Sequence, residues 1–177
     1  MEQTQIRIEE SQPLVSVDEF RQALGQLAAG VSIVTTQLEG DRRGVTATAV
    51  CSVTDSPGTV LVCINRNTGT GKMIADAGHF SVNVLGLDHE DVAMTFAGAR
   101  GVQGDERFEH GDWSEDAATG MPLLDQALVN LACKVSHVHS TATHDVFFGE
   151  VVAVRTAEAQ PLIYFGRGFH ETAPRSC

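Results

Sequence analysis

The stretch Gly44-Val45-Thr46-Ala47-Thr48-Ala49-Val50-Cys51-Ser52-Val53 is the part of the sequence that decides the fold. It is β-prone, short and free of proline, so it predicts one strand. Side chains alternate between the two faces of a strand, which places Thr46, Thr48 and Ser52 together on one face. Small residues let another molecule approach the backbone, and these hydroxyls can hydrogen-bond a planar polar ring. An ordinary Thr-rich barrel strand is the alternative interpretation.

The composition is that of one globular domain. A chain of 177 residues buries one core but is short for two domains, and 42% apolar with 20% charged residues excludes a disordered chain. The formal charge of -11 argues against nucleic acid or an anionic membrane as a partner. Apolar runs are too short to span a membrane and the polar N-terminus is no signal peptide, so we expect a cytoplasmic protein.

The cysteines do not predict a disulfide framework or a zinc site. Cys51, Cys63 and Cys133 each lie in an apolar, strand-like run, where a free thiol packs as a small hydrophobic residue, and Cys177 is at the C-terminus. The sequence contains no C-x-x-C pair.

The chain divides into an N-terminal arm (residues 1–15), one domain (16–172) and a short tail (173–177). The domain opens with a capping box, Ser16 and Glu19, followed by Phe20, Leu24 and Leu27 at helical spacing, with Gly30 as the expected end of the helix. Short helices are also expected at 72–77 and 88–97. Residues 98–122 form a long connection, which is usually functional or mobile.

Alternating or apolar runs bounded by turn residues predict the strands. They are expected at 31–36, 44–53, 59–65, 80–85, 128–139, 145–154 and 162–165, the first two forming a hairpin through a turn at 39–42. Strands and helices do not alternate as βαβ units. The pattern therefore predicts a mainly β fold with short helices, a closed antiparallel barrel rather than a doubly wound sheet.

The loop from Asn65 to Lys72 has the chemistry of a phosphate cradle. Its glycines let backbone N–H groups converge on an anion, Thr68 and Thr70 add hydroxyl donors, and a helix begins with Lys72 in its first turn. The spacing is not that of a P-loop. A polar loop between a strand and a helix is an equally good interpretation.

Three histidines offer a different interpretation of the C-terminal half. His137 and His139 share one face of a predicted strand, and with His144 they could bind a metal. The flanking glycines and spaced glutamate of a cupin are missing, so we expect solvated strand histidines and no metal.

The quoted stretch resembles the signature G-x-T-A-N/S-A/S-F-x-S-V of the flavin reductase-like family, whose members are FMN-binding split barrels. Four more segments resemble family motifs in the same order. These are 63–72, the pairs 96–97 and 107–108, 144–151, and 161–169. The resemblance extends from Phe20 to Phe169 and implies a closed antiparallel split β-barrel.

Carried over residue by residue, the resemblance implies where each ligand binds. His144 is the implied catalytic residue, beside the flavin edge where nicotinamide docks. Arg167 is the remaining candidate for the phosphates of the pyridine nucleotide, and Phe169 could stack on a ring. The full set of implied cofactor-binding residues is Thr46, Ala47, Thr48, Ser52, Cys63, Asn65, Thr68, Thr70, Lys72, Arg100, Arg107, Phe108, Arg167 and Phe169.

Four residues, at three places in the chain, depart from the family pattern. Thr48 stands where Asn or Ser is common, which removes an amide but keeps a hydrogen-bonding group. Ala142-Thr143 replaces the usual Gly-Asp before His144, which affects the turn that places the histidine. Phe169 replaces a tyrosine and cannot donate a hydrogen bond.

The resemblance implies an NAD(P)H:flavin oxidoreductase. A hydride passes from nicotinamide C4 to flavin N5, and the flavin is FMN or FAD while the electron donor is NADH or NADPH. Family members form homodimers, and in two-component systems the reduced flavin diffuses to a separate flavin-dependent monooxygenase. No nucleophile elbow or carboxylate pair recommends hydrolysis instead. The alternatives are a non-catalytic flavin-binding electron carrier on the same barrel, and a relative of pyridoxamine-phosphate oxidases.

Overall fold

The computed structural model describes residues 14–173. Most of the expected N-terminal arm, residues 1–13, and most of the expected tail, including Cys177, lie outside the described residues. Within residues 14–173, no helix has the length and apolar character needed to cross a membrane.

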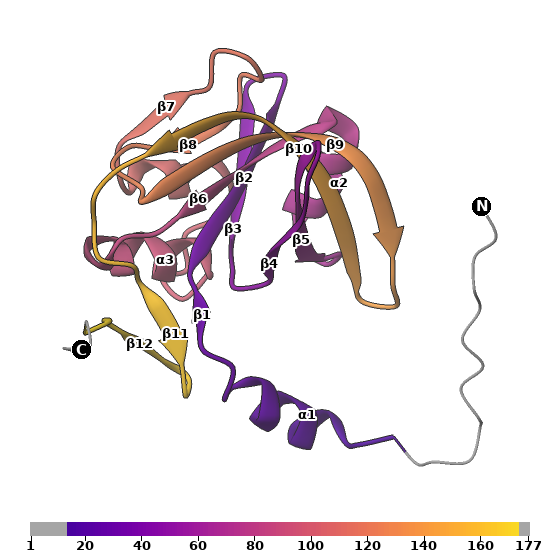
Figure 1. The fold of residues 1–177 in the computed structure, drawn as a ribbon, viewed down its shortest axis with the longest axis vertical. Coiled ribbons are helices and arrows are strands. Elements are labelled where there is room, and N and C mark those ends of the chain that lie inside the picture. Colours follow the sequence, from indigo (N-terminus) through magenta and orange to yellow (C-terminus); the bar gives the residue numbers. More distant parts are fainter. Residues whose placement is uncertain (1–13, 174–177) are drawn as a thin grey trace.

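Seven antiparallel strands form the main sheet (Figure 1). Across the sheet the order is β3 (Asp41–Ala47), β2 (Ser32–Leu38), β6 (His79–Val84), β9 (Val129–Ser140), β10 (His144–Thr156), β5 (Gly58–Asn65) and β4 (Val50–Asp55). The strands predicted at 31–36, 59–65, 80–85, 128–139 and 145–154 are thereby confirmed, as is the hairpin of β2 with β3. The tight turn of this hairpin is made by Glu39 and Gly40, both with positive φ.

The predicted strand at 44–53 is wrong in one respect: it is two strands. β3 ends at Ala47 and β4 begins at Val50, and these two strands lie at opposite edges of the sheet. Thr48 and Ala49, which we call the crossing, carry the chain from one edge to the other. The carbonyl of Ala49 accepts a hydrogen bond from Cys63 N (3.1 Å), which ties the crossing to β5.

The expected closed barrel is also wrong. Within residues 14–173, the main sheet pairs β3 only with β2 and β4 only with β5, so the sheet is open. The edge strands are joined by the covalent chain of the crossing, not by ladder hydrogen bonds. The fold is mainly β with short helices, as predicted.

Smaller elements surround the sheet. They are the helices α1 (Val17–Leu24), α2 (Gly69–Ala77) and α3 (Glu90–Phe96), the 3-10 helices η1 (Leu87–His89) and η2 (Gly104–Glu109), and the short strands β1 (Ala29–Gly30), β7 (Trp113–Glu115), β8 (Pro122–Leu124), β11 (Ile163–Phe165) and β12 (Gly168–His170). The long connection at 98–122 therefore holds η2 and β7, although the sequence predicted no regular structure there.

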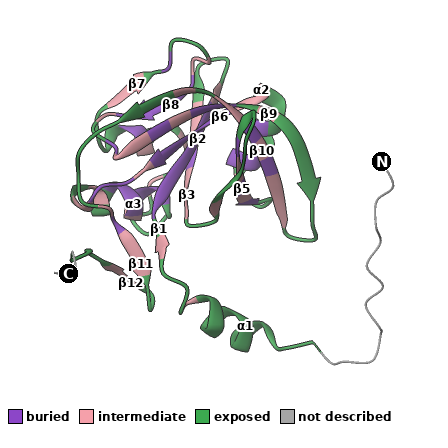
Figure 2. Ribbon diagram, viewed as in Figure 1, coloured by how far each residue is buried: buried purple, intermediate pink, exposed green. Residues whose placement is uncertain are grey.

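Helix α1 begins as predicted but ends early. The capping box is formed: Ser16 Oγ accepts from Glu19 N (3.2 Å), and the Glu19 carboxylate accepts from Ser16 N (3.0 Å). The helix ends at Gly25 rather than at Gly30. It stands apart from the sheet (Figure 1) and is exposed along its length (Figure 2), with Phe20 and Leu24 on the surface.

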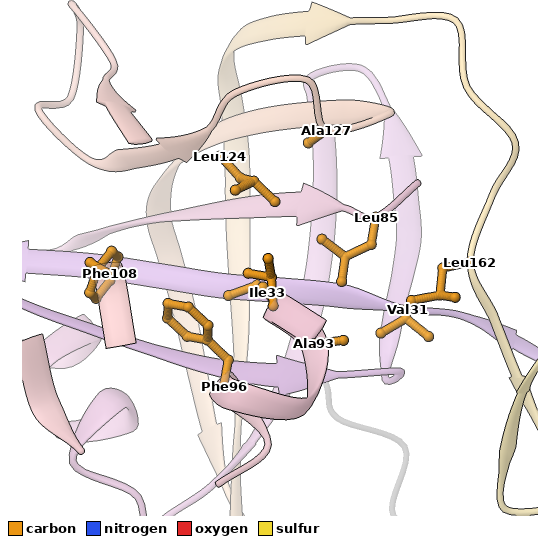
Figure 3. Packing of buried hydrophobic residues seen from close by; sticks show 10 residues of the cluster. Val31, Ile33, Leu85, Ala93, Phe96, Phe108, Leu124, Ala127 and Leu162 are labelled. Atoms are coloured by element: carbon orange, nitrogen blue, oxygen red, sulfur yellow. The ribbon is translucent and has the colours of Figure 1, made fainter. Parts of the chain in front are cut away.

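The core has two parts, one on each face of β2. Ile33 and Val34 are adjacent on β2 and fully buried, so their side chains enter opposite faces. On the first face, Ile33 packs with Phe96 of α3 and with Leu124 of β8 (Figure 3). On the second face, Val34 belongs to a cluster that includes Ile74 of α2.

The cysteines are in different environments. Cys133 is fully buried, and burial raises its pKa to about 12, so this thiol packs as a hydrophobic side chain, as predicted. Cys51 is exposed on the edge strand β4, so the prediction of an apolar environment there is wrong.

A buried amide organises the first core. Asn83 of β6 donates to Ile33 O (3.0 Å) and to Thr35 Oγ1 (3.1 Å). Its own Oδ1 accepts from Leu124 N (2.9 Å) and from Asn130 Nδ2 (2.8 Å). One side chain thereby links β2, β6, β8 and β9 without leaving a polar atom of the amide unpaired.

We expect Gly149→Ala to destabilise the protein by about 2 kcal/mol because the core has no room for the added methyl group. A Cβ on Gly149 would lie 2.5 Å from the Phe80 ring and 2.8 Å from Cys133 Cβ. The free energy of unfolding, measured in urea, checks this. Gly58→Ala is the matched control, since nothing lies within 4 Å of a Cβ at Gly58. Equal stability of the two variants would contradict the prediction.

Candidate functional site

Several hollows meet at the crossing. Thr46, Ala47 and Thr48 line two of them, and Thr48 also lines a third that extends toward α1. The side chains at these three positions are small. Only Thr48 keeps a hydroxyl that is exposed there, because Thr46 Oγ1 donates to Ala93 O of α3 (2.6 Å).

The first hollow, of about 240 Å³, lies between the end of β3, β5 and the start of β10. It brings together Cys63, Asn65 and His144 with the crossing. The β5–β10 ladder explains this, because Asn65 is paired with His144 in the register. Burial raises the pKa of the Cys63 thiol and the charge of Asp145 raises it further, so this cysteine is neutral at pH 7.

The second hollow, of about 230 Å³, lies on the other side of the crossing and is mostly apolar. It is lined by Val31, Met94, Ala97, Tyr164 and Phe169 together with Thr46, Ala47 and Thr48. Tyr164 and Phe169 are partners in the β11–β12 hairpin, and their rings meet edge to face with centroids 5.5 Å apart. The two hollows thus leave space on both sides of residues 46–48.

Another hollow, of about 380 Å³, lies beside these and is suited to an anion; we call it the anion hollow. Two arginines line it, Arg43 and Arg107, and no acidic residue does. This is notable in a chain with a formal charge of -11. Glycines form much of the remaining wall, which lets backbone N–H groups approach a ligand.

The N-terminus of α2 opens into this anion hollow. Thr68 is the N-cap residue, but its hydroxyl donates to Asn65 O (2.7 Å) and does not cap the helix. The first N–H groups of α2 are therefore not capped by a side chain, and the helix dipole favours a negative charge at this end. Thr68, Gly69 and Thr70 all line the hollow.

Arg107 is held by backbone carbonyls. Its guanidinium donates to Val102 O (2.9 Å), Phe96 O (3.1 Å) and Gly44 O (3.3 Å). No ion pair involves Arg107 among residues 14–173. Its positive charge is consequently fixed at the wall of the hollow without a neutralising carboxylate.

A neighbouring ion pair positions this wall. Arg42 binds the Asp105 carboxylate through two nitrogens (2.7 and 3.0 Å) and lies over the Phe108 ring, 4.5 Å from its centroid. The hydrogen bond from Arg42 lowers the pKa of Asp105. The pair connects η2 to β3 and leaves Arg43, the next residue, on the hollow.

Hydrogen bonds fix the turn that carries His144. Thr141 Oγ1 accepts from His144 N (3.2 Å), and Thr141 N donates to His144 O (2.8 Å). His144 Nδ1 lies 2.8 Å from Thr143 Oγ1. In place of the usual Gly-Asp, therefore, a threonine hydroxyl contacts the ring, and a hydroxyl can either donate or accept.

Four of the predicted site residues lie away from these hollows. Ser52 is exposed on β4, because the break at the crossing cancels the alternation that placed it beside Thr48. Lys72 is exposed on α2, and Arg100 pairs with Asp91 on the surface. Phe108 is buried against Phe96.

The remaining ten cofactor-site candidates and His144 do line the hollows, with Arg167 on the side toward α1. Sequence reasoning missed Arg43, Asn67, Met94 and Tyr164. A signal for Arg43 existed: it stands directly before the Gly44 stretch, one residue after the predicted hairpin turn.

The histidine alternative finds no support in the geometry. Residues 14–173 contain no group of three or more His, Cys, Asp or Glu side chains that could hold a metal ion. His137 instead lies against the Phe148 ring, with centroids 5.6 Å apart.

The family model for the flavin reductase like domain matches residues 24–173, and the chain belongs to this family. The resemblance noted in the sequence is thereby confirmed.

Particular relatives agree with this assignment. The chain is 46% identical over 161 residues to the FMN reductase (NADH) RutF of Pseudomonas syringae pv. syringae, covering 89% of each chain. It is 43% identical over 152 residues to the 4-hydroxyphenylacetate 3-monooxygenase reductase component of Pseudomonas aeruginosa, covering 85% of this chain and 89% of the relative. A solved structure of the Streptomyces globisporus NADH:FAD oxidoreductase SgcE6, with NAD and FAD fragments, has a TM-score of 0.84 at 26% identity and covers 94% and 100%.

Proposed function

We propose that this protein is an NADH:flavin oxidoreductase that supplies reduced flavin to a partner oxygenase. Its family and the names of its relatives support this function. The observation that carries it is the arrangement of hollows. A space between small residues and His144 lies beside an anion hollow with two arginines, the N-terminus of α2 and no acidic residue.

The described residues fit a flavin phosphate. A phosphate monoester is a dianion, and the anion hollow offers Arg43 and Arg107 as charge-assisted donors. The N–H groups at the start of α2 add donors that no side chain caps. Gly44 separates this hollow from the crossing, so a phosphate there would leave the flavin ring to lie against Thr46, Ala47 and Thr48.

When bound, the flavin supplies the electron-accepting centre, N5, for a hydride from nicotinamide C4. The chain's own residues orient the two rings. Thr48 offers a hydroxyl to a ring edge, and Ala47 leaves its flat backbone free for stacking. Phe169 and Tyr164 exclude water from the apolar side. His144 faces the same space from β10 and is our candidate catalytic residue.

We expect Thr143→Val to lower kcat/KM for NADH about five-fold, because the His144 ring loses one hydrogen bond of about 1 kcal/mol. Thr143→Ser keeps the hydroxyl and is expected to match the parent enzyme. Steady-state kinetics with both variants, together with the ¹⁵N NMR signals of the His144 ring, measure the effect. Parent-like kinetics in Thr143→Val would show that the hydroxyl does not position the ring.

The reduced flavin is proposed to leave the enzyme and diffuse to a separate flavin-dependent monooxygenase. The monooxygenase component named among the relatives supports this. We place this exchange in the cytoplasm, where NADH is available and where the three described cysteines remain thiols.

The protein is further proposed to be a homodimer. Val17, Phe20 and Leu24 form one apolar side of α1, and they are 63%, 53% and 45% exposed. A helix of eight residues is marginal without packing, so this side needs a cover, which we assign to a second copy of the chain. Light scattering should give twice the monomer mass, and Phe20→Asp should shift it to the monomer. Leu38→Asp, on the distant β2–β3 hairpin, is the control.

The decisive experiment is NADH consumption by the purified protein with and without added FMN or FAD. We expect turnover that depends on flavin, faster with NADH than with NADPH. A protein that holds flavin tightly but does not oxidise either nicotinamide would be the electron carrier instead. Activity on pyridoxamine phosphate without oxidation of NADH or NADPH would identify the protein as a relative of the pyridoxamine-phosphate oxidases.

A further inference from the structure

Arg66 makes three contacts around His144, although it lines none of the hollows described above. Its backbone N–H donates to Thr143 O (3.0 Å), and its guanidinium Nη1 donates to Thr141 O (3.3 Å). Its Nε lies 3.6 Å from Asp145 Oδ1. One residue thereby contacts the chain on both sides of His144.

Asp145 lies where a carboxylate is unexpected. In the β5–β10 register it is paired with Ile64, a core residue that is 1% exposed, so the two side chains share one side of the sheet. The Asp145 side chain is 18% exposed, and its Oδ1 is buried without a hydrogen-bond donor among the described residues. A buried polar atom without a donor costs free energy, so it calls for an explanation. Within the described chain, the cation paired with this carboxylate is Arg66.

These contacts reach His144 through the backbone. Adjacent residues of a strand face opposite ways, so Asp145 points away from the side on which His144 lines the first hollow. We call residues 141–144 the His144 turn, and hydrogen bonds within it fix its shape. The β5–β10 ladder ends at the pair of Asn65 and His144. Arg66 supplies contacts to the turn beyond that end, so it restrains the direction of the turn relative to β5.

Arg66 also lies between the two parts of the proposed flavin site. Asn65, before it, lines the first hollow with His144, and Asn67, after it, lines the anion hollow. Asn67 N donates to Asn65 Oδ1 (2.9 Å), and Thr68 N donates to Asn65 O (3.0 Å), so this stretch is itself held in place. The His144 turn is consequently fixed relative to the wall of the anion hollow as well.

We propose that Arg66, with Asp145 as its counter-ion, is a positioning residue that holds the His144 ring at a fixed place relative to the flavin phosphate. The inference rests on the proposed function, in which His144 is the candidate catalytic residue. A guanidinium suits this task because its planar fork can donate to a carbonyl and pair with a carboxylate at once. A lysine offers the same charge without the fork.

Steady-state kinetics test the proposal. Arg66→Ala is expected to lower kcat/KM for NADH about ten-fold, the loss of one charge-assisted contact, with KM for FMN within two-fold of the parent. Arg66→Lys keeps the charge beside Asp145 but not the fork, so we expect a loss of about three-fold. Arg155→Ala, on the same strand as His144 and with Ser114 as its side-chain partner, is the matched control and should match the parent. Equal losses for NADH and FMN in Arg66→Ala would overturn the inference.

A double-mutant cycle with His144 separates positioning from a general loss of stability. If Arg66 acts through the histidine, adding Arg66→Ala to His144→Ala should change kcat/KM for NADH less than two-fold. A further ten-fold loss in the double variant would overturn the inference, because Arg66 would then act independently of His144.

The ring signals of His144 in ¹⁵N NMR spectra test the geometry without turnover. Their absence in His144→Ala assigns them, and we expect them to shift in Arg66→Ala but not in Arg155→Ala. Unchanged signals in Arg66→Ala would overturn the inference. If the signals shift as expected but the parent protein does not oxidise NADH, the proposed function fails and the positioning of the ring remains.

Discussion

In Arg107→Gln, KM for FMN is expected to rise about 30-fold while KM for riboflavin stays within two-fold of the parent. Riboflavin lacks the phosphate, so it does not use the anion hollow. A hydrogen bond to a charged group contributes about 1.5–3 kcal/mol, and its loss gives an effect of this size. Steady-state rates with NADH and each flavin measure the two constants.

Arg107 also donates to three backbone carbonyls, so its replacement could raise KM for FMN by disturbing the wall of the hollow. A second variant tests for this. Arg43 lines the same hollow from β3, and its side chain is 33% exposed, donates to Arg42 O (2.8 Å) and pairs loosely with Asp41 at 3.7 Å. Arg43→Gln should raise KM for FMN about ten-fold. An equal rise for FMN and riboflavin in both variants would show that the hollow does not bind the phosphate.

Asn83→Leu is expected to lower the free energy of unfolding by about 4 kcal/mol. The change leaves Leu124 N and Asn130 Nδ2 without their shared acceptor, and it removes the donor to Ile33 O. Buried groups left unpaired cost about 1–3 kcal/mol each.

Urea unfolding measures this loss, with Asn67→Leu as the control. Asn67 is exposed, and surface changes usually stay within about 0.5 kcal/mol. If the two leucine variants were equally stable, the amide would not organise the core as described.

Much of the fold could be predicted because its signals are local. The capping box at Ser16 and the tight turn at Glu39–Gly40 depend on residues close in sequence, and both are present. The end of α1 was harder to predict, because Gly25 and Gly30 both suit a helix terminus. Phe108 was assigned to the flavin from a motif, but it is buried because Phe96 and Trp113 enclose it, which no local pattern encodes.

The crossing could not be predicted for a related reason. Residues 44–53 have strand propensity throughout, and propensity does not say which partner each half will pair with. The first half pairs with β2 and the second with β5, which are far apart across the sheet. The prediction that Thr46, Thr48 and Ser52 share one face was therefore wrong for Ser52, because Ser52 follows the break in the strand.

The crossing also determines when in folding a ligand can be recognised. Thr48 and Ala49 reach their final places only after both edge strands have paired, since β3 holds the chain before them and β4 holds the chain after them. An unfolded or half-assembled chain therefore offers no ring site, and occupancy stabilises the complete sheet rather than one part of it. At a ligand concentration 100 times the Kd this linkage adds about 2.7 kcal/mol to the native state.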